Sequence, residues 1–163
     1  MATITELSRF RDRYPTASER DQLSSYASNI GSRLLAVEEM GRIEADIIDD
    51  MMTQMKRLYP NIPQFHTNGF EKGYRDNTIL LQYMTKCMLL DDVQFLDDQV
   101  LTWVRTLFKS FNFTPKFMRD NYTTLREAVR RRAKPRTFAL MEPFLNHTIE
   151  YLSDIPEPVR PEV

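Results

Sequence analysis

The sequence is short of the residues on which several common kinds of site depend. Its 163 residues include one cysteine, which rules out an intramolecular disulfide and a multi-cysteine zinc site. Two histidines, far apart, give a histidine-based metal site little support. Four glycines are too few for hairpin-rich β folds or glycine-rich phosphate loops. No apolar run approaches the roughly 18 residues of a membrane span, and the signal-peptide pattern is missing, so we expect a soluble protein.

Charge of either sign is also not in excess. Lysine and arginine total 22 and aspartate and glutamate total 23, which gives a formal net charge of −1. This balance excludes the strongly basic character of general nucleic-acid or membrane binders. We therefore expect no nucleic-acid partner and at most peripheral association with a membrane.

What the sequence does have is helical periodicity between its nine prolines. We predict a single all-α domain over residues 1–153 with an irregular, globin-like packing, an ordered loop over 60–69, and a proline-rich flexible tail over 154–163. Helices are expected over 3–13, from 16 through 26, over 32–58 and 71–90, from Asp97 or Asp98 to 111, over 115–132, and from 136 to 152.

Local signals mark several helix starts. Thr16 and Glu19 form a capping-box pattern, and Thr114-Pro115 combines a capping hydroxyl with proline at the first helical position. Asp92 is placed to cap a short turn. Glu38 and Glu39 are expected to lie largely off the apolar stripe of the long helix. Inward residues of the other helices are expected to include Leu80, Met84, Cys87, Met88, Leu101, Phe108, Phe111, Met118, Tyr122, Leu125, Val129, Met141, Phe144 and Leu152.

Few residues are arranged as catalytic groups or metal ligands. No nucleophile and base stand together, so we expect no enzyme. Cys87 is expected to be an inert core thiol, His66 and His147 structural histidines, and the acidic doublets helix caps or solvated faces rather than a metal site. The segment 126–136 carries a local charge of +5. It either docks an acidic partner, a phosphate or a membrane surface through Arg130, Arg131 and Arg132, or complements a helix dipole; we favour the second interpretation.

A more specific pattern appears between residues 73 and 115. Tyr74-Arg75-Asp76, then Tyr83, Thr85, Asp92, the run from Asp98 to Ser110, and Thr114-Pro115 resemble the phycobiliproteins, the light-harvesting subunits of phycobilisomes. The resemblance spans about residues 10–153. It implies a globin-like domain preceded by an N-terminal helical hairpin that mediates subunit pairing.

The resemblance also implies a pigment site. In that family a cysteine two residues before the Arg-Asp pair forms a thioether with an open-chain tetrapyrrole, the arginine reaches a propionate, and the aspartate accepts from pyrrole nitrogens. Arg75 and Asp76 stand in those places, but the cysteine position is Gly73. Cys87 lies about 21 Å farther along the helix axis and cannot replace it. Covalent attachment is therefore not expected, and Arg75, Asp76, Lys72 and Tyr83 are candidates for a non-covalent bilin site.

The family's usual pairing residues are replaced as well. Its subunits pair through an aspartate in the N-terminal hairpin and an arginine nine positions after the bilin cysteine. Arg9 and Gln82 stand there, which removes both halves of that ion pair. We keep both positions as partner-binding candidates, for a contact other than the usual heterodimer.

Together these observations favour a chromophore-free phycobilisome-type protein. It would act by protein–protein contact in assembly, docking or regulation of a cyanobacterial light-harvesting complex, in the cytoplasm or at the cytoplasmic face of the thylakoid membrane. Its partners would be phycobilisome or photosystem proteins, or a second copy in a homodimer, and no cofactor is expected. The alternative is a protein that binds a bilin without a covalent bond, in light harvesting or bilin handling.

Overall fold

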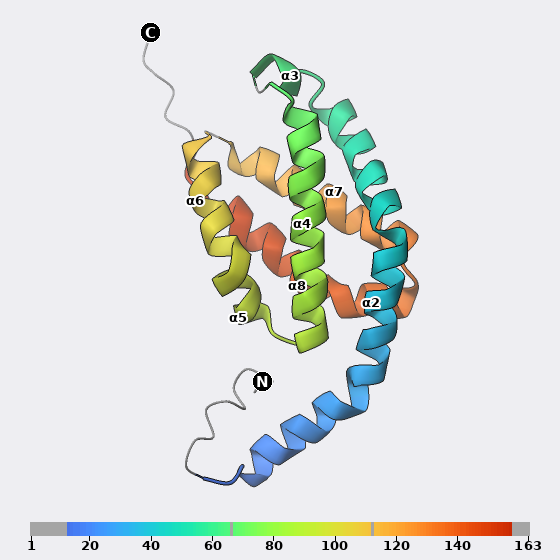
Figure 1. Cartoon of the computed structure of the whole chain (residues 1–163). Helices are drawn as coiled ribbons and strands as arrows, with labels where there is room; N and C mark the ends of the chain where they lie inside the picture. Colours follow the sequence, from blue (N-terminus) through green and yellow to red (C-terminus); the bar gives the residue numbers. More distant parts are fainter. Residues whose placement is uncertain (1–12, 66, 112, 158–163) are drawn as a thin grey trace.

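A computed structural model describes residues 13–65, 67–111 and 113–157, which form helices and no strand. The expected all-α fold is confirmed. Residues 3–12 of the predicted helix over 3–13, which include Arg9, lie outside the described residues, as does His66. The elements are α2 (Ala17–Leu58), α3 (Ile62–Phe65), α4 (Gly69–Leu90), α5 (Val93–Leu96), the π-helical turn η1 (Asp97–Leu101), α6 (Thr102–Ser110), α7 (Pro115–Arg132) and α8 (Pro135–Ser153) (Figure 1).

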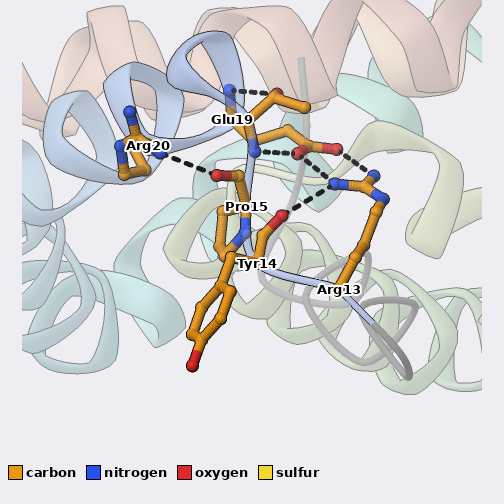
Figure 2. A network of polar contacts seen from close by, with 6 residues as sticks. Arg13, Tyr14, Pro15, Glu19 and Arg20 are labelled. Atoms are coloured by element: carbon orange, nitrogen blue, oxygen red, sulfur yellow. Dashed lines mark hydrogen bonds and ion pairs between the residues drawn. The ribbon is translucent and has the colours of Figure 1, made fainter.

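Helix α2 begins at the predicted capping box. The Thr16 hydroxyl accepts from the Glu19 N–H, and the Glu19 carboxylate accepts from the Thr16 N–H at 2.6 Å. The Arg13 guanidinium binds both oxygens of that carboxylate at 2.8 and 2.9 Å (Figure 2). The hydrogen bonds from Arg13 and then from Thr16 lower the pKa of Glu19 to about 2. This network fixes the direction in which the chain enters α2.

The expectation of two separate helices before residue 58 is wrong. α2 continues for 42 residues and passes through Gly31 without a break. A single glycine costs a helix only about 1 kcal/mol, and no proline occurs between Pro15 and Pro60 to force an end. The first part of α2 runs away from the rest of the molecule (Figure 1).

The core lies where the second half of α2 packs with α4, α7 and α8. The four helices bury the apolar faces that their periodicity predicts, and we find Leu80, Met84, Cys87, Met88, Met118, Tyr122, Leu125, Val129, Met141, Phe144 and Leu152 at most 3% exposed. Leu58, the last residue of α2, is 56% exposed. No helix in the described residues has the length and apolarity needed to cross a bilayer.

Between α4 and α7 the regular α-helical spacing of residues is interrupted. Asp92 caps α5 as predicted, because its carboxylate accepts from the Phe95 N–H at 2.9 Å. No new helix is capped at Asp97, since α5, η1 and α6 are continuous through a π-helical turn. That turn shifts the phase of the residues that follow it. Phe111, expected inside, is the C-cap residue that follows α6 and is 52% exposed, although Leu101 is buried.

A buried carboxylate joins α2 to the start of α8. Glu39 is 7% exposed, which corrects its placement off the buried stripe. It accepts from the Lys134 N–H at 2.7 Å and from the Thr137 hydroxyl at 2.8 Å. The N-cap residue of α8 makes no side-chain cap of its own. α2 thus supplies the cap that α8 lacks.

Two further segments complete the described chain. The expected loop over 60–69 contains the short helix α3. Beyond α8, the Arg105 guanidinium binds the Asp154 carboxylate at 2.7 Å, and Ile155 is 7% exposed. The first residues of the predicted tail are therefore held against the body.

Candidate functional site

The first turns of α4 carry the position of the expected bilin attachment. Gly73 is half-buried in α4, and a Cβ added to it would meet the Met52 Cε at 3.5 Å, an ordinary contact distance. Packing therefore does not demand glycine here, and a side chain the size of cysteine begins in available space. The lack of a thiol is a feature of the site and is not imposed by the fold.

Arg75 and Asp76 bind each other. The Arg75 Nε and Nη2 donate to the Asp76 Oδ1 at 2.9 and 2.8 Å. Both side chains face solvent, with 68% and 54% of their areas exposed. An exposed pair of this kind contributes at most about 1 kcal/mol to stability. The two groups that would hold a tetrapyrrole thus partly satisfy each other.

Behind this pair lies a buried polar connection that the sequence analysis missed. The Asn77 amide donates to the Gly73 carbonyl at 2.8 Å, and the Asn121 amide donates to the Asn77 Oδ1 at 3.0 Å. Beside them, burial and then the nearby Asp76 charge raise the pKa of Tyr122. The sequence signal that could have revealed this connection is the position of Asn77, which lies three residues before Leu80 on the apolar stripe of α4.

Lys72 and Tyr83 share a face of α4 with Asp76, because they lie four residues before it and seven after it. Tyr83 is half-buried, with the Lys86 Nζ 5.0 Å from its ring centroid. Lys72 is exposed and, within the described part of the chain, forms no hydrogen bond or ion pair with Arg75 or Asp76. Of the four candidate bilin contacts, the structure joins Arg75 and Asp76 directly.

The other candidate ligands are engaged in the fold. Cys87 is buried, so the predicted core position is confirmed, and burial raises the pKa of its thiol to about 12. The His147 Nε2 lies 2.6 Å from the Asp97 Oδ1, which ties α8 to η1. Among the described residues, no group of three or more histidine, cysteine, aspartate or glutamate side chains is arranged to bind a metal ion.

The opposite side of α4 contributes to an open groove with α2, and this groove contains Gln82. The Gln82 amide donates to the Glu44 carboxylate at 3.1 Å. A Cβ added to Gly41, which also lines the groove, would meet nothing within 4 Å. Other lining residues are Val37, Met40, Leu81 and Lys86. The groove therefore has an apolar floor, a polar rim and free space above Gly41.

The three consecutive arginines, Arg130, Arg131 and Arg132, make different contacts. Arg132 binds both oxygens of Asp50 at 2.7 Å, and Arg131 lies 3.8 Å from the same carboxylate. The hydrogen bond from Arg132 holds the pKa of Asp50 below its usual value. Arg130 instead lies over the Phe138 ring, 6.0 Å from its centroid. Arg131 and Arg132 connect α7 to α2, while Arg130 faces the start of α8.

The described helices define a globin-like all-α protein whose α4 carries an exposed Arg-Asp pair. The sequence matches the phycobilisome protein family over residues 10–152, and the chain belongs to that family. A search of curated proteins gives no match. The protein is thus of the phycobilisome type, in a family of structural light-harvesting proteins.

Proposed function

We propose that this protein carries no bilin at the family's attachment site and acts by protein–protein contact in a cyanobacterial light-harvesting complex. Its partner would be a phycobilisome or photosystem protein, and the contact would form in the cytoplasm or at the cytoplasmic face of the thylakoid. The observation that carries this proposal is Gly73 at the thioether position.

The contact between Arg75 and Asp76, close to Gly73, supports the absence of a pigment. A bilin site needs a guanidinium free for a propionate and a carboxylate free for pyrrole N–H groups. Arg75 and Asp76 instead bind each other in solvent. A pigment would have to separate them without the gain of a covalent bond.

The α2–α4 groove supports the contact function. Two large apolar side chains near this floor are exposed: Leu34 is 54% exposed and Ile79 is 43% exposed. Leu34 lies one turn before Val37 on α2, and Ile79 lies one turn before Gln82 on α4. An apolar centre with a polar rim is the usual anatomy of a protein interface.

Two glycines of α2 offer a matched test. Gly41→Trp would fill the groove, and Gly31→Trp would add the same side chain elsewhere on α2, where an added Cβ also meets nothing within 4 Å. We expect Gly41→Trp to abolish co-sedimentation with purified phycobilisomes and photosystem complexes, and Gly31→Trp to retain it. Equal binding by both variants, or no binding by the unmodified protein, would contradict the proposed contact.

Non-covalent bilin binding is a second candidate function. The observation in its favour is that the Asp76 carboxylate keeps 54% of its area exposed on the same face as Lys72 and Tyr83. We expect added biliverdin to acquire an induced circular dichroism band only if this site binds it. Loss of that band in Asp76→Ala would support the second candidate, and no band in the unmodified protein would remove it.

A further inference from the structure

One asparagine of the chain precedes a glycine. Asn68 is followed by Gly69, whereas every other asparagine in the sequence is followed by a larger residue. The amide carbon of an asparagine side chain can be attacked by the main-chain nitrogen of the next residue, and a side chain on that next residue hinders the attack. Glycine has no side chain and leaves the backbone free to rotate. The Asn68-Gly69 peptide is therefore where this reaction meets the least steric resistance.

The backbone of Asn68 already has part of the conformation that the attack requires. The attack closes a five-membered imide ring that includes the Cα and Cβ atoms of the asparagine. This ring fixes ψ at about −120°, the value of the first central residue of a type II′ turn, where φ is about +60°. Asn68 has a φ of 57° and a ψ of 28°. The φ angle thus matches, and rotation about the Cα–C bond of Asn68 alone brings the Gly69 nitrogen to the side chain.

Asn68 is exposed, and its side chain does not cap α4. It occupies the N-cap position of that helix, but its side chain forms no capping hydrogen bond. The Gly69 N–H, at the first helical position, has no acceptor within the helix. The rotation breaks the hydrogen bond from the Lys72 N–H to the Asn68 carbonyl, which measures 2.9 Å. Helix ends open locally at a small cost in free energy, so this rotation is open to the folded protein.

A second asparagine between α2 and α4 provides a contrast. Asn61 is also exposed, but the residue after it is Ile62, which is branched at Cβ. The Ile62 N–H donates to the Tyr59 carbonyl at 3.3 Å. At Asn61 the nitrogen that would attack is therefore both hydrogen-bonded and shielded by its own side chain. We expect Asn61 to be unreactive under conditions in which Asn68 reacts.

We propose that Asn68 is a site of spontaneous modification, where the folded protein converts asparagine into aspartate and isoaspartate. The Gly69 nitrogen forms a bond to the Asn68 Cγ, the Cγ–Nδ2 bond breaks, and ammonia leaves with the proton of the Gly69 N–H. Water then opens the imide, at Cγ to give aspartate or at the main-chain carbonyl to give isoaspartate, and the Gly69 nitrogen regains a proton. The overall change consumes water and releases ammonia. It does not depend on the proposed function.

The two products change the start of α4 in different ways. Aspartate is as good an N-cap as asparagine, and its charge suits the positive end of the helix dipole. Isoaspartate adds a methylene to the main chain before the first turn, which displaces the carbonyl that accepts from the Lys72 N–H. Either product makes the formal net charge of −1 more negative by one unit. The modification therefore alters both charge and geometry at the start of the helix that carries Gly73.

Peptide mapping by mass spectrometry tests the proposal on the folded, full-length protein. During incubation in mildly alkaline buffer, which promotes loss of the Gly69 N–H proton, we expect aspartate and isoaspartate to accumulate at Asn68 and Asn61 to remain unchanged. Fragmentation that cleaves the Cα–Cβ bond of isoaspartate distinguishes the two products. An unchanged Asn68 at the end of the incubation, or conversion of Asn61 at the same rate, would overturn the proposal.

Gly69→Ala tests the mechanism, because it keeps the asparagine and adds a Cβ to the attacking residue. We expect the isoaspartate product to be lost over the same incubation. No glycine in the described part of the chain has a positive φ, and alanine is the better helix former, so the unfolding temperature of this variant should be unchanged or raised. Asn68→Asp should migrate with the modified protein in isoelectric focusing. Conversion of Gly69→Ala as fast as that of the unmodified protein would contradict attack by the Gly69 nitrogen.

Discussion

The polar residues of α2 and α4 divide into an inward set and an outward set. Inward, Glu39 and Asn77 are 7% and 5% exposed and link their helices to α8 and α7. Outward, Arg75 and Asp76 stand in solvent and bind each other. The inward side chains form hydrogen bonds with specific protein partners in place of water, and the outward side chains remain hydrated.

This difference separates what holds the fold from what the family uses for pigment. A buried donor left without a partner costs about 1–3 kcal/mol, whereas an exposed ion pair contributes about 0–1 kcal/mol. The globin-like body therefore does not depend on Arg75 and Asp76. On α4 the residues that hold the fold are separate from those that the family uses for pigment, and substitutions on its two sides should differ accordingly.

The largest effect is expected at Glu39. Glu39→Ala leaves the Lys134 N–H and the Thr137 hydroxyl without their acceptor and removes the cap of α8, so the free energy of unfolding should fall by about 2–4 kcal/mol. Urea denaturation followed by circular dichroism measures it. The exposed neighbour substitution Glu38→Ala should change the value by less than about 0.5 kcal/mol. Equal effects at both positions would break the division between the two sets.

The same residue predicts a pH dependence. Burial by itself raises the pKa of Glu39, but hydrogen bonds from the Lys134 N–H and the Thr137 hydroxyl outweigh it, so the pKa lies below its ordinary 4.5. The contribution of Glu39 is therefore fully present above that pH and is lost as pH falls through the lower folded-state pKa. The stability difference between the protein and Glu39→Ala should shrink in acid. A constant difference down to about pH 2 would contradict this assignment.

A smaller loss is expected on the inward side of α4. Asn121→Ala removes the donor to the Asn77 Oδ1 and should lower the free energy of unfolding by about 1–3 kcal/mol. Replacing both asparagines by leucine removes donor and acceptor together. That double variant should recover part of the loss, and chemical denaturation of the two variants side by side measures the recovery. A double variant less stable than Asn121→Ala would argue against the pair.

The smallest effect is expected on the outward side. Asp76→Asn and Arg75→Gln should each change the free energy of unfolding by less than about 0.5 kcal/mol, because water replaces the lost partner. Thermal and chemical denaturation of the two variants gives the values. A loss above about 2 kcal/mol at either residue would place it among the structural groups and remove the distinction drawn on α4.

Much of the architecture follows from local sequence. Apolar spacing placed the buried faces of α4, α7 and α8, because each face repeats at helical intervals. Thr16, Asp92 and Thr114 identified helix starts, since each cap involves only neighbouring residues. The break expected between residues 26 and 32 is wrong, because the local helix penalty of Gly31 is weak and is outweighed by the rest of α2.

The errors arise where distant segments or the end of a helix decide the outcome. Glu39 is buried by the start of α8, 95 residues later in the chain, which no local pattern reveals. Phe111 is exposed although helical spacing predicts it inside, because α6 ends at Ser110 and Phe111 is its C-cap residue. At the candidate site, the sequence located Arg75 and Asp76 but not their mutual ion pair, because adjacent helical residues diverge and only the long arginine side chain closes the gap.

The central claim is that Gly73 leaves this phycobilisome-family protein without a covalently bound bilin. The most direct measurement is the absorption spectrum of the protein after co-expression with a bilin-producing pathway and lyase, recorded before and after denaturation in acidic urea. Gly73→Cys, which has room for its side chain beside Met52, serves as the matched variant. We predict that the unmodified chain retains no colour on denaturation and that Gly73→Cys gains a covalently attached pigment. Colour that stays with the unmodified chain through denaturation would contradict the account.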